Sequence, residues 1–114
     1  MSRIVIVGTT RLSMTMPVEE FPVPFRPYRW PAWMSCAVVG GAYNVACALR
    51  SLGDEPHICT LVGTDEAGAV IQAALRRRGL HGRGVVETQE SAKTLILVEP
   101  DGRTSRSAQG TRGP

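Results

Sequence analysis

In the middle of the chain, apolar runs alternate with helical patterns, and glycines separate them. This order constrains the fold more than any other feature of the sequence. The apolar run Ala37–Val39 leads into a glycine pair, and a second run, Ile58–Val62, leads into Gly63. A helical pattern follows each run, and a single glycine ends each helix, at Gly53 and Gly79. Strands and helices in this order predict an α/β fold, with a parallel sheet and right-handed crossovers.

Both helical patterns have the spacing of surface helices that pack on a sheet. Apolar side chains recur every three or four residues in the first helix, predicted near 44–52, and in the second, predicted over 66–78. Asp65 stands directly before the second helix. We interpret it as a helix cap rather than a catalyst, because an aspartate at this position accepts hydrogen bonds from the free backbone N–H groups.

Further strands are predicted on both sides of this segment. Ile4–Val7 is a continuous β-branched run, which is typical of a strand covered on both faces. A weak strand is predicted at 84–86, a better one at 94–98 and a return strand near 104–108. Residues 9–16 are predicted to be irregular. Residues 110–114 have no apolar content and are expected to fray.

The candidate binding residues are Gly40, Gly41 and Asn44. Glycines without a Cβ let a ligand approach the backbone closely, and an Asn amide can both donate and accept hydrogen bonds. The alternatives are structural: a tight turn for the glycines and a helix N-cap for Asn44. We favour substrate binding because the pair occurs together with Asn44 at a fixed distance.

This string resembles the first signature of the PfkB family, the ribokinase-like carbohydrate kinases. The matching residues are Gly40, Gly41, Asn44, Ala46, Gly53 and Gly63. The likeness runs from Arg3 to about Gln109 and is strongest from 38 to 80. It implies part of a ribokinase-like, Rossmann-type sheet flanked by helices. In the intact family, the enzyme transfers the γ-phosphoryl group of ATP, with Mg²⁺, to a hydroxyl of a sugar or nucleoside.

The resemblance also implies that the catalytic base lies in a second signature, Gly-Ala-Gly-Asp, which is absent from this sequence. We therefore expect residues 1–114 to be the N-terminal, substrate-side portion of such a kinase, inactive alone. This segment is expected to hold no catalytic residue, no metal ligand and no ATP or Mg²⁺. The alternative is a non-catalytic sugar-binding or dimerisation module. Ser13 stands where family members usually carry a substrate-binding Asp, which leaves the substrate open.

A segment rich in proline and aromatic residues precedes the glycine pair. Its prolines exclude a helix or a central strand; they are Pro17, Pro22, Pro24, Pro27 and Pro31. The resemblance implies a lid over about 11–36, a βαβ core over about 37–109 and a frayed tail over 110–114. We expect the lid aromatics to cover a substrate or to form a homodimer contact. The alternative is that they fill the chain's own core.

Composition favours a cytoplasmic protein that contacts neither membrane nor nucleic acid. No apolar run approaches the roughly 20 residues that span a bilayer. The net charge is +3, but the basic residues are dispersed, and no aromatic residues are interleaved with the arginines at 76–78 or with Arg103, Arg106 and Arg112. Three widely spaced cysteines are typical of reduced thiols. His57 and His81 lack a partner at metal-ligand spacing.

Overall fold

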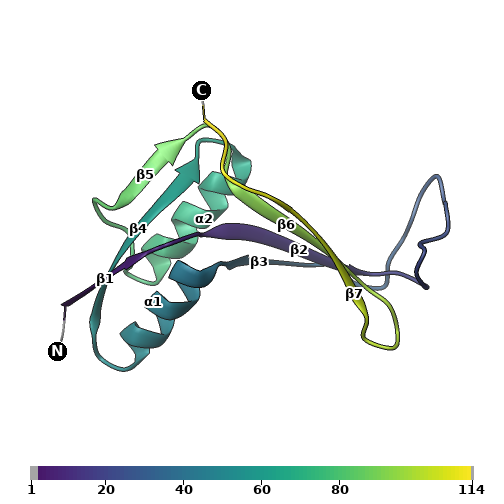
Figure 1. The fold of residues 1–114 in the computed structure, drawn as a ribbon, viewed down its shortest axis with the longest axis horizontal. Helices are drawn as coiled ribbons and strands as arrows, with labels where there is room; N and C mark the ends of the chain where they lie inside the picture. Colours follow the sequence, from purple (N-terminus) through teal and green to yellow (C-terminus); the bar gives the residue numbers. More distant parts are fainter. Residues whose placement is uncertain (1–2, 114) are drawn as a thin grey trace.

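The computed structural model describes residues 3–113, which form two sheets and two helices (Figure 1). The first sheet is parallel, in the order β1-β4-β5, with strands Arg3–Val7, Glu55–Gly63 and Val85–Thr88. The second sheet is mixed, in the order β3-β2-β6-β7, with β2 Arg11–Pro17, β3 Ser35–Val39, β6 Ala92–Val98 and β7 Thr104–Gln109. Helix α1 spans Gly41–Ser51, and α2 spans Glu66–Arg77.

The two predicted helices are confirmed, and their ends follow from local chemistry. Helix α2 begins after Asp65, whose side chain accepts a hydrogen bond from the backbone N–H of Gly68, as predicted for a cap. Helix α1 begins three residues earlier than predicted. Its N-cap is Gly40, so the N-cap alternative for Asn44 is wrong. Gly53 follows the end of α1 and has a φ of +89°. A positive φ is common directly after a helix, and glycine adopts it without strain.

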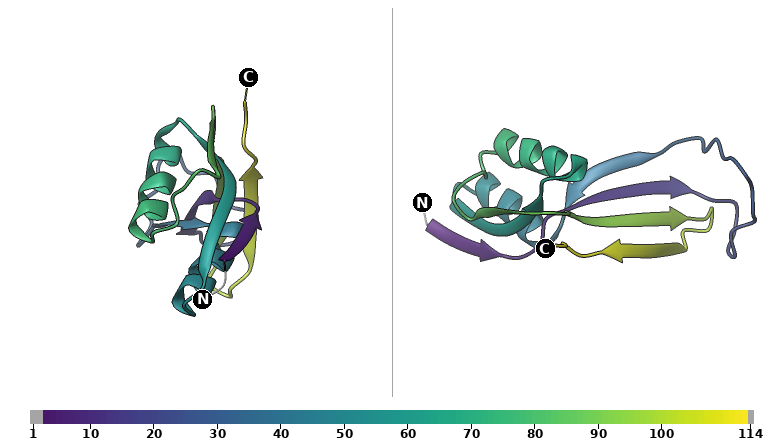
Figure 2. Two further views of the ribbon diagram at one scale, coloured as in Figure 1. Left: turned by 90° about the vertical axis from the view of Figure 1, so that its left-hand side faces the viewer. Right: turned by 90° about the horizontal axis from the view of Figure 1, so that it is seen from above.

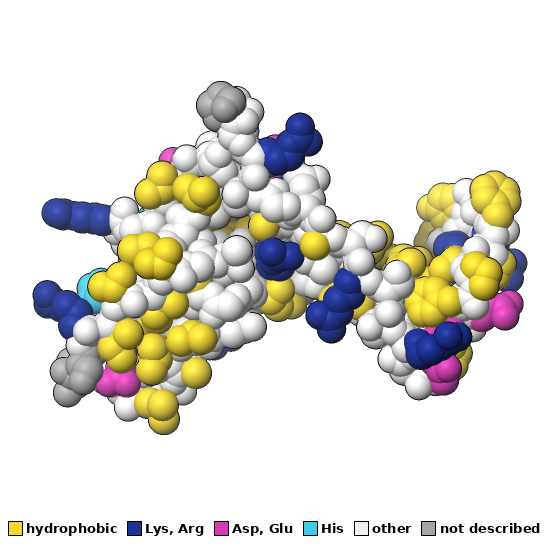
Figure 3. Space-filling model, viewed as in Figure 1, with side chains coloured by type: hydrophobic (Ala, Val, Ile, Leu, Met, Phe, Trp, Pro, Cys, Tyr) yellow, Lys and Arg dark blue, Asp and Glu magenta, His cyan; other side chains and the backbone are white. Residues whose placement is uncertain are grey.

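Both helices cover the same face of the three-stranded sheet (Figure 2). The core between them includes Ala46, Val62, Ile71 and Leu75, all fully buried. The other face is open and carries Val5, Val7, Leu61 and Val86, of which Val7 is 80% exposed. Hydrophobic side chains gather on this open face in Figure 3. The prediction that the first strand is covered on both faces is therefore wrong for the residues that the structure describes.

The four-stranded sheet extends away from the helices (Figure 1). Strand β2 of this sheet covers most of residues 9–16, so the prediction that they are irregular is wrong. Strand β2 pairs in parallel with β6, from Arg11↔Ala92 to Pro17↔Val98. Residues 37–109 therefore do not form one sheet. Strands β6 and β7 belong to the sheet of β2 and β3, whereas β4 and β5 belong to the other sheet.

The proline-rich segment 18–34 contains no helix or strand, as its composition predicts. Four of its five aromatic side chains are exposed, with Phe25 at 90% and Trp30 at 88%, while Phe21 is half-buried. The alternative that these rings fill the chain's own core is therefore wrong. The residues after β7 were predicted to fray, but Arg112 is held in place. Its backbone groups exchange hydrogen bonds of 2.8 and 3.1 Å with those of Glu90. Residue 114 lies outside the described residues.

Candidate functional site

The glycine pair and Asn44 lie at the carboxyl end of β1, where the first turn of α1 meets the β1–β2 connection. The backbone N–H of Ala42 donates to the carbonyl oxygen of Thr9 at 3.2 Å. A Cβ added to Gly8 would lie 3.2 Å from the Ala42 Cβ, so the connection and the helix are closely packed. Ligands of open α/β sheets bind outside the carboxyl ends of the strands. The three predicted residues therefore stand at the edge where a ligand is expected.

The two glycines have different surroundings. Gly40 has a φ of +123°, and a Cβ there would collide with the Thr9 carbonyl oxygen. The turn alone thus requires a glycine at this position. This is the tight-turn role that was the alternative to substrate binding. Apart from its chain neighbours and the backbone of its own helix turn, no atom lies within 4 Å of a Cβ built on Gly41. Gly41 is therefore the member of the pair whose backbone is open to a ligand.

Asn44 lies on the outer face of α1, three residues after Gly41. Residues three apart share one face of a helix, and the buried residues Ala42, Tyr43 and Ala46 occupy the opposite face. The Asn44 side chain is exposed, and its backbone N–H donates to the Gly40 carbonyl oxygen at 2.9 Å. The carboxamide is thus available to a ligand at the same end of the helix as the open glycine.

Strand β2 has a polar face, and its first residue is paired with Val39, which directly precedes Gly40. Arg11 and Ser13 alternate with apolar residues and so share one face of the sheet. Ser13 is buried between its strand partners Ala37 and Thr94. The Nη1 atom of Arg11 donates to the Thr94 hydroxyl at 2.8 Å.

Sequence reasoning missed Arg11 because it predicted residues 9–16 to be irregular. The signal was present as an alternation with a period of two, because Leu12, Met14 and Met16 are apolar and the residues between them are polar.

A cavity of about 200 Å³ opens where the two sheets meet. Its wall consists of Gly8, Thr9, Thr10, Arg11, Thr60, Leu61, Ala92, Gly110 and Thr111. The hydroxyls of Thr10 and Thr60 share a buried hydrogen bond of 3.1 Å at this junction. The wall is thus rich in hydroxyl and backbone groups, and Arg11 is its one charged member.

A larger cavity, of about 600 Å³, lies at the other end of the three-stranded sheet. It is lined by the first residues of β4 and by the loop from Gly79 to Gly84, together with Arg3 and Arg50. This is the amino end of the parallel strands, away from the glycine pair. Because ligands of such sheets bind at the carboxyl ends, we place the candidate site at the start of α1. The smaller cavity lies at the same end of β1, but its wall includes none of Gly40, Gly41 and Asn44.

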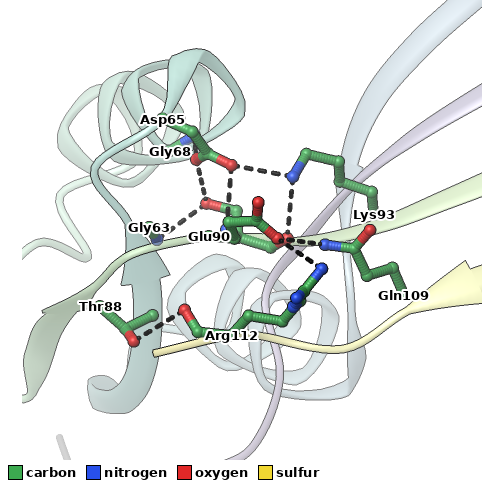
Figure 4. Close-up of polar contacts among 9 residues, drawn as sticks. Gly63, Asp65, Gly68, Thr88, Glu90, Lys93, Gln109 and Arg112 are labelled. Carbon is green, nitrogen blue, oxygen red and sulfur yellow. Dashed lines mark hydrogen bonds and ion pairs between the residues drawn. The ribbon is translucent and has the colours of Figure 1, made fainter. Parts of the chain in front are cut away.

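Asp65 connects the two sheets close to this edge (Figure 4). Its carboxylate accepts hydrogen bonds from Lys93 Nζ at 2.8 Å and from the hydroxyl and backbone N–H of Ser91 at 2.9 and 3.1 Å. Burial by itself would raise the pKa of this carboxyl, but these bonds and the one from Gly68 hold it well below its usual range. Asp65 thus fixes β6 against α2, which agrees with a structural role rather than catalysis.

The described residues hold no group of three or more His, Cys, Asp or Glu side chains that could bind a metal ion. His57 lies 3.9 Å from Glu55, and His81 shares a hydrogen bond of 2.8 Å with Gln72 on the surface. Neither histidine adjoins the start of α1.

Known proteins resemble this chain in sequence or in fold. Bifunctional protein HldE of Citrifermentans bemidjiense is 39% identical over 63 residues, which are 53% of this chain and 13% of that protein. The nucleoside kinase of Methanocaldococcus jannaschii superposes with a TM-score of 0.80 at 21% identity, covering 96% of this chain and 37% of that one. Arabidopsis thaliana ribokinase, solved with ribose and ATP, gives a TM-score of 0.81 at 18% identity, covering 95% and 35%.

The two solved structures share the fold of this chain, which spans only 13% to 37% of the length of the three proteins. A sequence model for the pfkB family of carbohydrate kinases matches residues 1–111, nearly all of the chain. The alternation of strands, helices and glycines, the sheet topology and this match lead to one assignment: the chain belongs to the pfkB carbohydrate kinase family.

Proposed function

We propose that this chain forms the substrate-side portion of an ATP-dependent carbohydrate kinase and binds a sugar or nucleoside at the start of α1. The observation that carries the proposal is the open backbone of Gly41 beside the exposed carboxamide of Asn44, at the carboxyl end of β1. Relatives with this fold include a ribokinase solved with ribose and a nucleoside kinase. Hydroxyl groups are the chemistry that such a pair recognises.

The chain's own contribution is to position the acceptor. Hydrogen bonds from Asn44 would fix one hydroxyl, and the bare backbone of Gly41 would let the sugar ring lie against the helix start. Holding the acceptor in one orientation lowers the entropic part of the barrier for transfer. In the whole kinase, ATP supplies the phosphoryl group and Mg²⁺ neutralises its charge. Within residues 3–113 we assign no general base, so the chain alone is expected to give no turnover.

Isothermal titration calorimetry tests this proposal with ribose and adenosine as ligands. We expect saturable binding of at least one of them, weakened at least tenfold in Asn44→Ala. Gln89→Ala is the matched control, because Gln89 is also an exposed amide but lies between β5 and β6. Absence of binding to either ligand, or equal losses in both variants, would refute the proposal. A coupled ATPase assay on the same samples checks the expected absence of turnover.

We further propose that the exposed aromatic segment 18–34 forms a homodimer contact, which is the second candidate role. Phe25 and Trp30 are each about nine-tenths exposed, and the rings of Tyr28 and Trp30 lie 5.3 Å apart. Such apolar clusters mark contact sites. Sedimentation velocity should show a dimer that Phe25→Ser/Trp30→Ser converts to a monomer. Val7→Thr changes another strongly exposed apolar residue, outside the segment, and dissociation by that control alone would contradict this role.

None of the helices in the described part of the chain combines the length and apolar content needed to cross a membrane.

A further inference from the structure

The cavity of about 600 Å³ at the amino ends of β1 and β4 is not used by the proposed function. Three arginines from different parts of the chain line it. Arg3 begins β1, Arg50 lies in the last turn of α1, and Arg83 lies in the loop between α2 and β5. The fold thus brings three like charges to one concavity, where they repel one another.

The single carboxylate in this wall balances only part of the charge. Glu55 Oε2 lies 3.6 Å from Nε of Arg3, and Glu55 Oε1 lies 3.9 Å from Nε2 of His57. Within residues 3–113, neither Arg50 nor Arg83 has an ion pair or a side-chain hydrogen bond. Three arginines and one glutamate leave two positive charges when the histidines are neutral. An anion from outside the chain would balance them.

Gly79 gives the Arg50 guanidinium a fixed place at the wall. A Cβ built on Gly79 would lie 2.8 Å from Nη2 and 3.1 Å from Cζ of Arg50. Gly79 also has a φ of +69°, a conformation that glycine adopts without strain. The guanidinium therefore packs against bare backbone although the residue as a whole is exposed. A side chain held in this way loses less entropy when it binds a ligand.

The loop before β5 supplies backbone donors to the same wall. In the part of the chain that the structure describes, the N–H groups of His81, Gly82 and Arg83 donate to no protein acceptor. The space around a Cβ position on Gly82 is open, so a ligand can reach this backbone. Successive backbone N–H groups in a turn bind anions. The loop thus offers an anion the same kind of contact as the arginines.

Apolar side chains complete the wall of the cavity. They are Val5, Pro56, Ile58 and Leu80. A cleft that combines charges of one sign with low-dielectric walls focuses the field and concentrates ligands of the opposite charge. The volume lies within the roughly 300–1,000 Å³ that is typical of small-molecule pockets. It therefore has room for more than a single phosphate group.

We propose that this cavity binds a polyphosphate chain, the diphosphate or triphosphate group of a small molecule, between Arg50 and Arg83. Each guanidinium donates two parallel hydrogen bonds to phosphate oxygens, so two guanidiniums match a chain of linked phosphates better than one phosphate. Inorganic polyphosphate and nucleotides share this chain. The proposal goes beyond the proposed function and does not depend on it, because the sugar site lies at the carboxyl end of β1.

Calorimetry with the full chain tests the proposal by comparing tripolyphosphate with inorganic phosphate. We expect saturable binding of tripolyphosphate, at least about tenfold tighter than that of phosphate. Arg50→Gln/Arg83→Gln should weaken it at least about tenfold. The matched control, Arg77→Gln/Arg106→Gln, removes the same charge from two exposed arginines outside the wall and should leave the affinity unchanged. No saturable binding, equal affinity for phosphate, or equal losses in the two double variants would overturn the proposal.

Two further ligands identify the source of the chain. CTP carries a triphosphate on a nucleoside. Tighter binding of CTP than of tripolyphosphate, lost in Arg50→Gln/Arg83→Gln, assigns the cavity to a nucleotide, whereas equal or weaker binding assigns it to the free chain. A single-stranded oligothymidylate that binds as tightly as tripolyphosphate would show a general basic surface and overturn the proposal. Asn44→Ala should leave tripolyphosphate binding unchanged, which separates this test from that of the sugar site.

Thermal unfolding keeps the proposal testable if Arg50→Gln/Arg83→Gln fails to fold. A ligand that binds the native state raises the Tm, so tripolyphosphate should raise the Tm of the wild-type chain. The increase should shrink as salt rises from about 50 to about 500 mM. Arg50→Lys/Arg83→Lys keeps both charges without the planar fork and should retain an intermediate increase. A Tm that tripolyphosphate does not change would contradict the proposal.

Discussion

Replacing Gly40 by alanine tests how the turn between β3 and α1 is built. The residue combines a φ of +123° with a ψ of 154°, a region that is essentially restricted to glycine. Its missing Cβ also leaves room for the neighbouring connection, because an added Cβ would collide with the carbonyl oxygen of Thr9 and approach the Cα of Thr10 to 3.0 Å. Strain and collision therefore act together at this one position.

The expected loss follows from these two contributions. Strain in this backbone region costs another residue about 1–3 kcal/mol. Displacing the packed backbone of Thr9 adds about 1–3 kcal/mol, as overpacking does. We therefore expect Gly40→Ala to lower the free energy of unfolding by about 4 kcal/mol, which is a large part of the stability of a small domain.

Urea denaturation of three variants separates the contributions. Gly102 has a φ of +94° but open space around its Cβ position, so Gly102→Ala should lose only about 1–2 kcal/mol from strain. Gly41 has open space and lies in α1, so Gly41→Ala should change stability by less than about 1 kcal/mol. All three changes stiffen the unfolded chain alike. A loss in Gly40→Ala no greater than in Gly102→Ala would refute the collision with Thr9.

The remaining predictions concern the connection made by Asp65. Asp65→Ala should lower the free energy of unfolding at pH 7 by about 2–4 kcal/mol, because the cap of α2 and the bonds to Ser91 and Lys93 are lost; a loss below about 1 kcal/mol in urea would contradict it. The folded state depresses the pKa of Asp65, so its stabilisation is complete above the unfolded pKa of about 3.9 and declines as pH falls below it. Wild type should therefore lose more stability than Asp65→Asn between about pH 5 and pH 2, and parallel pH curves would exclude this origin.

The helices could be predicted from the sequence because their signals are local. Asp65 caps α2 through a bond to Gly68, three residues away, and Gly79 ends the same helix with a φ of +69°. Strands β4 and β6 coincide with apolar runs, and β7 comes directly after a turn, so their signals are local as well. Such signals act within four residues, so a single sequence contains them completely.

The pairing of β2 with β6 could not be predicted, because it joins residues far apart in the chain. Strand β6 follows β5 but pairs with β2, more than 70 residues away. Strand β2 itself was missed since its apolar positions are mostly methionine and its termini carry arginine and proline. Its alternation has a period of two, but only the neighbours β3 and β6 show that the segment is a strand.

The sequence by itself determined the family, the two helices and the presence of a glycine pair with Asn44 at a strand-to-helix turn, because each depends on residue type and short spacing. Only the tertiary structure decided that Gly40 serves the turn while Gly41 remains open. It also placed Arg11 in a cavity with no carboxylate in its wall. Both findings depend on which backbone atoms approach each other in space, and residues distant in the sequence set those approaches.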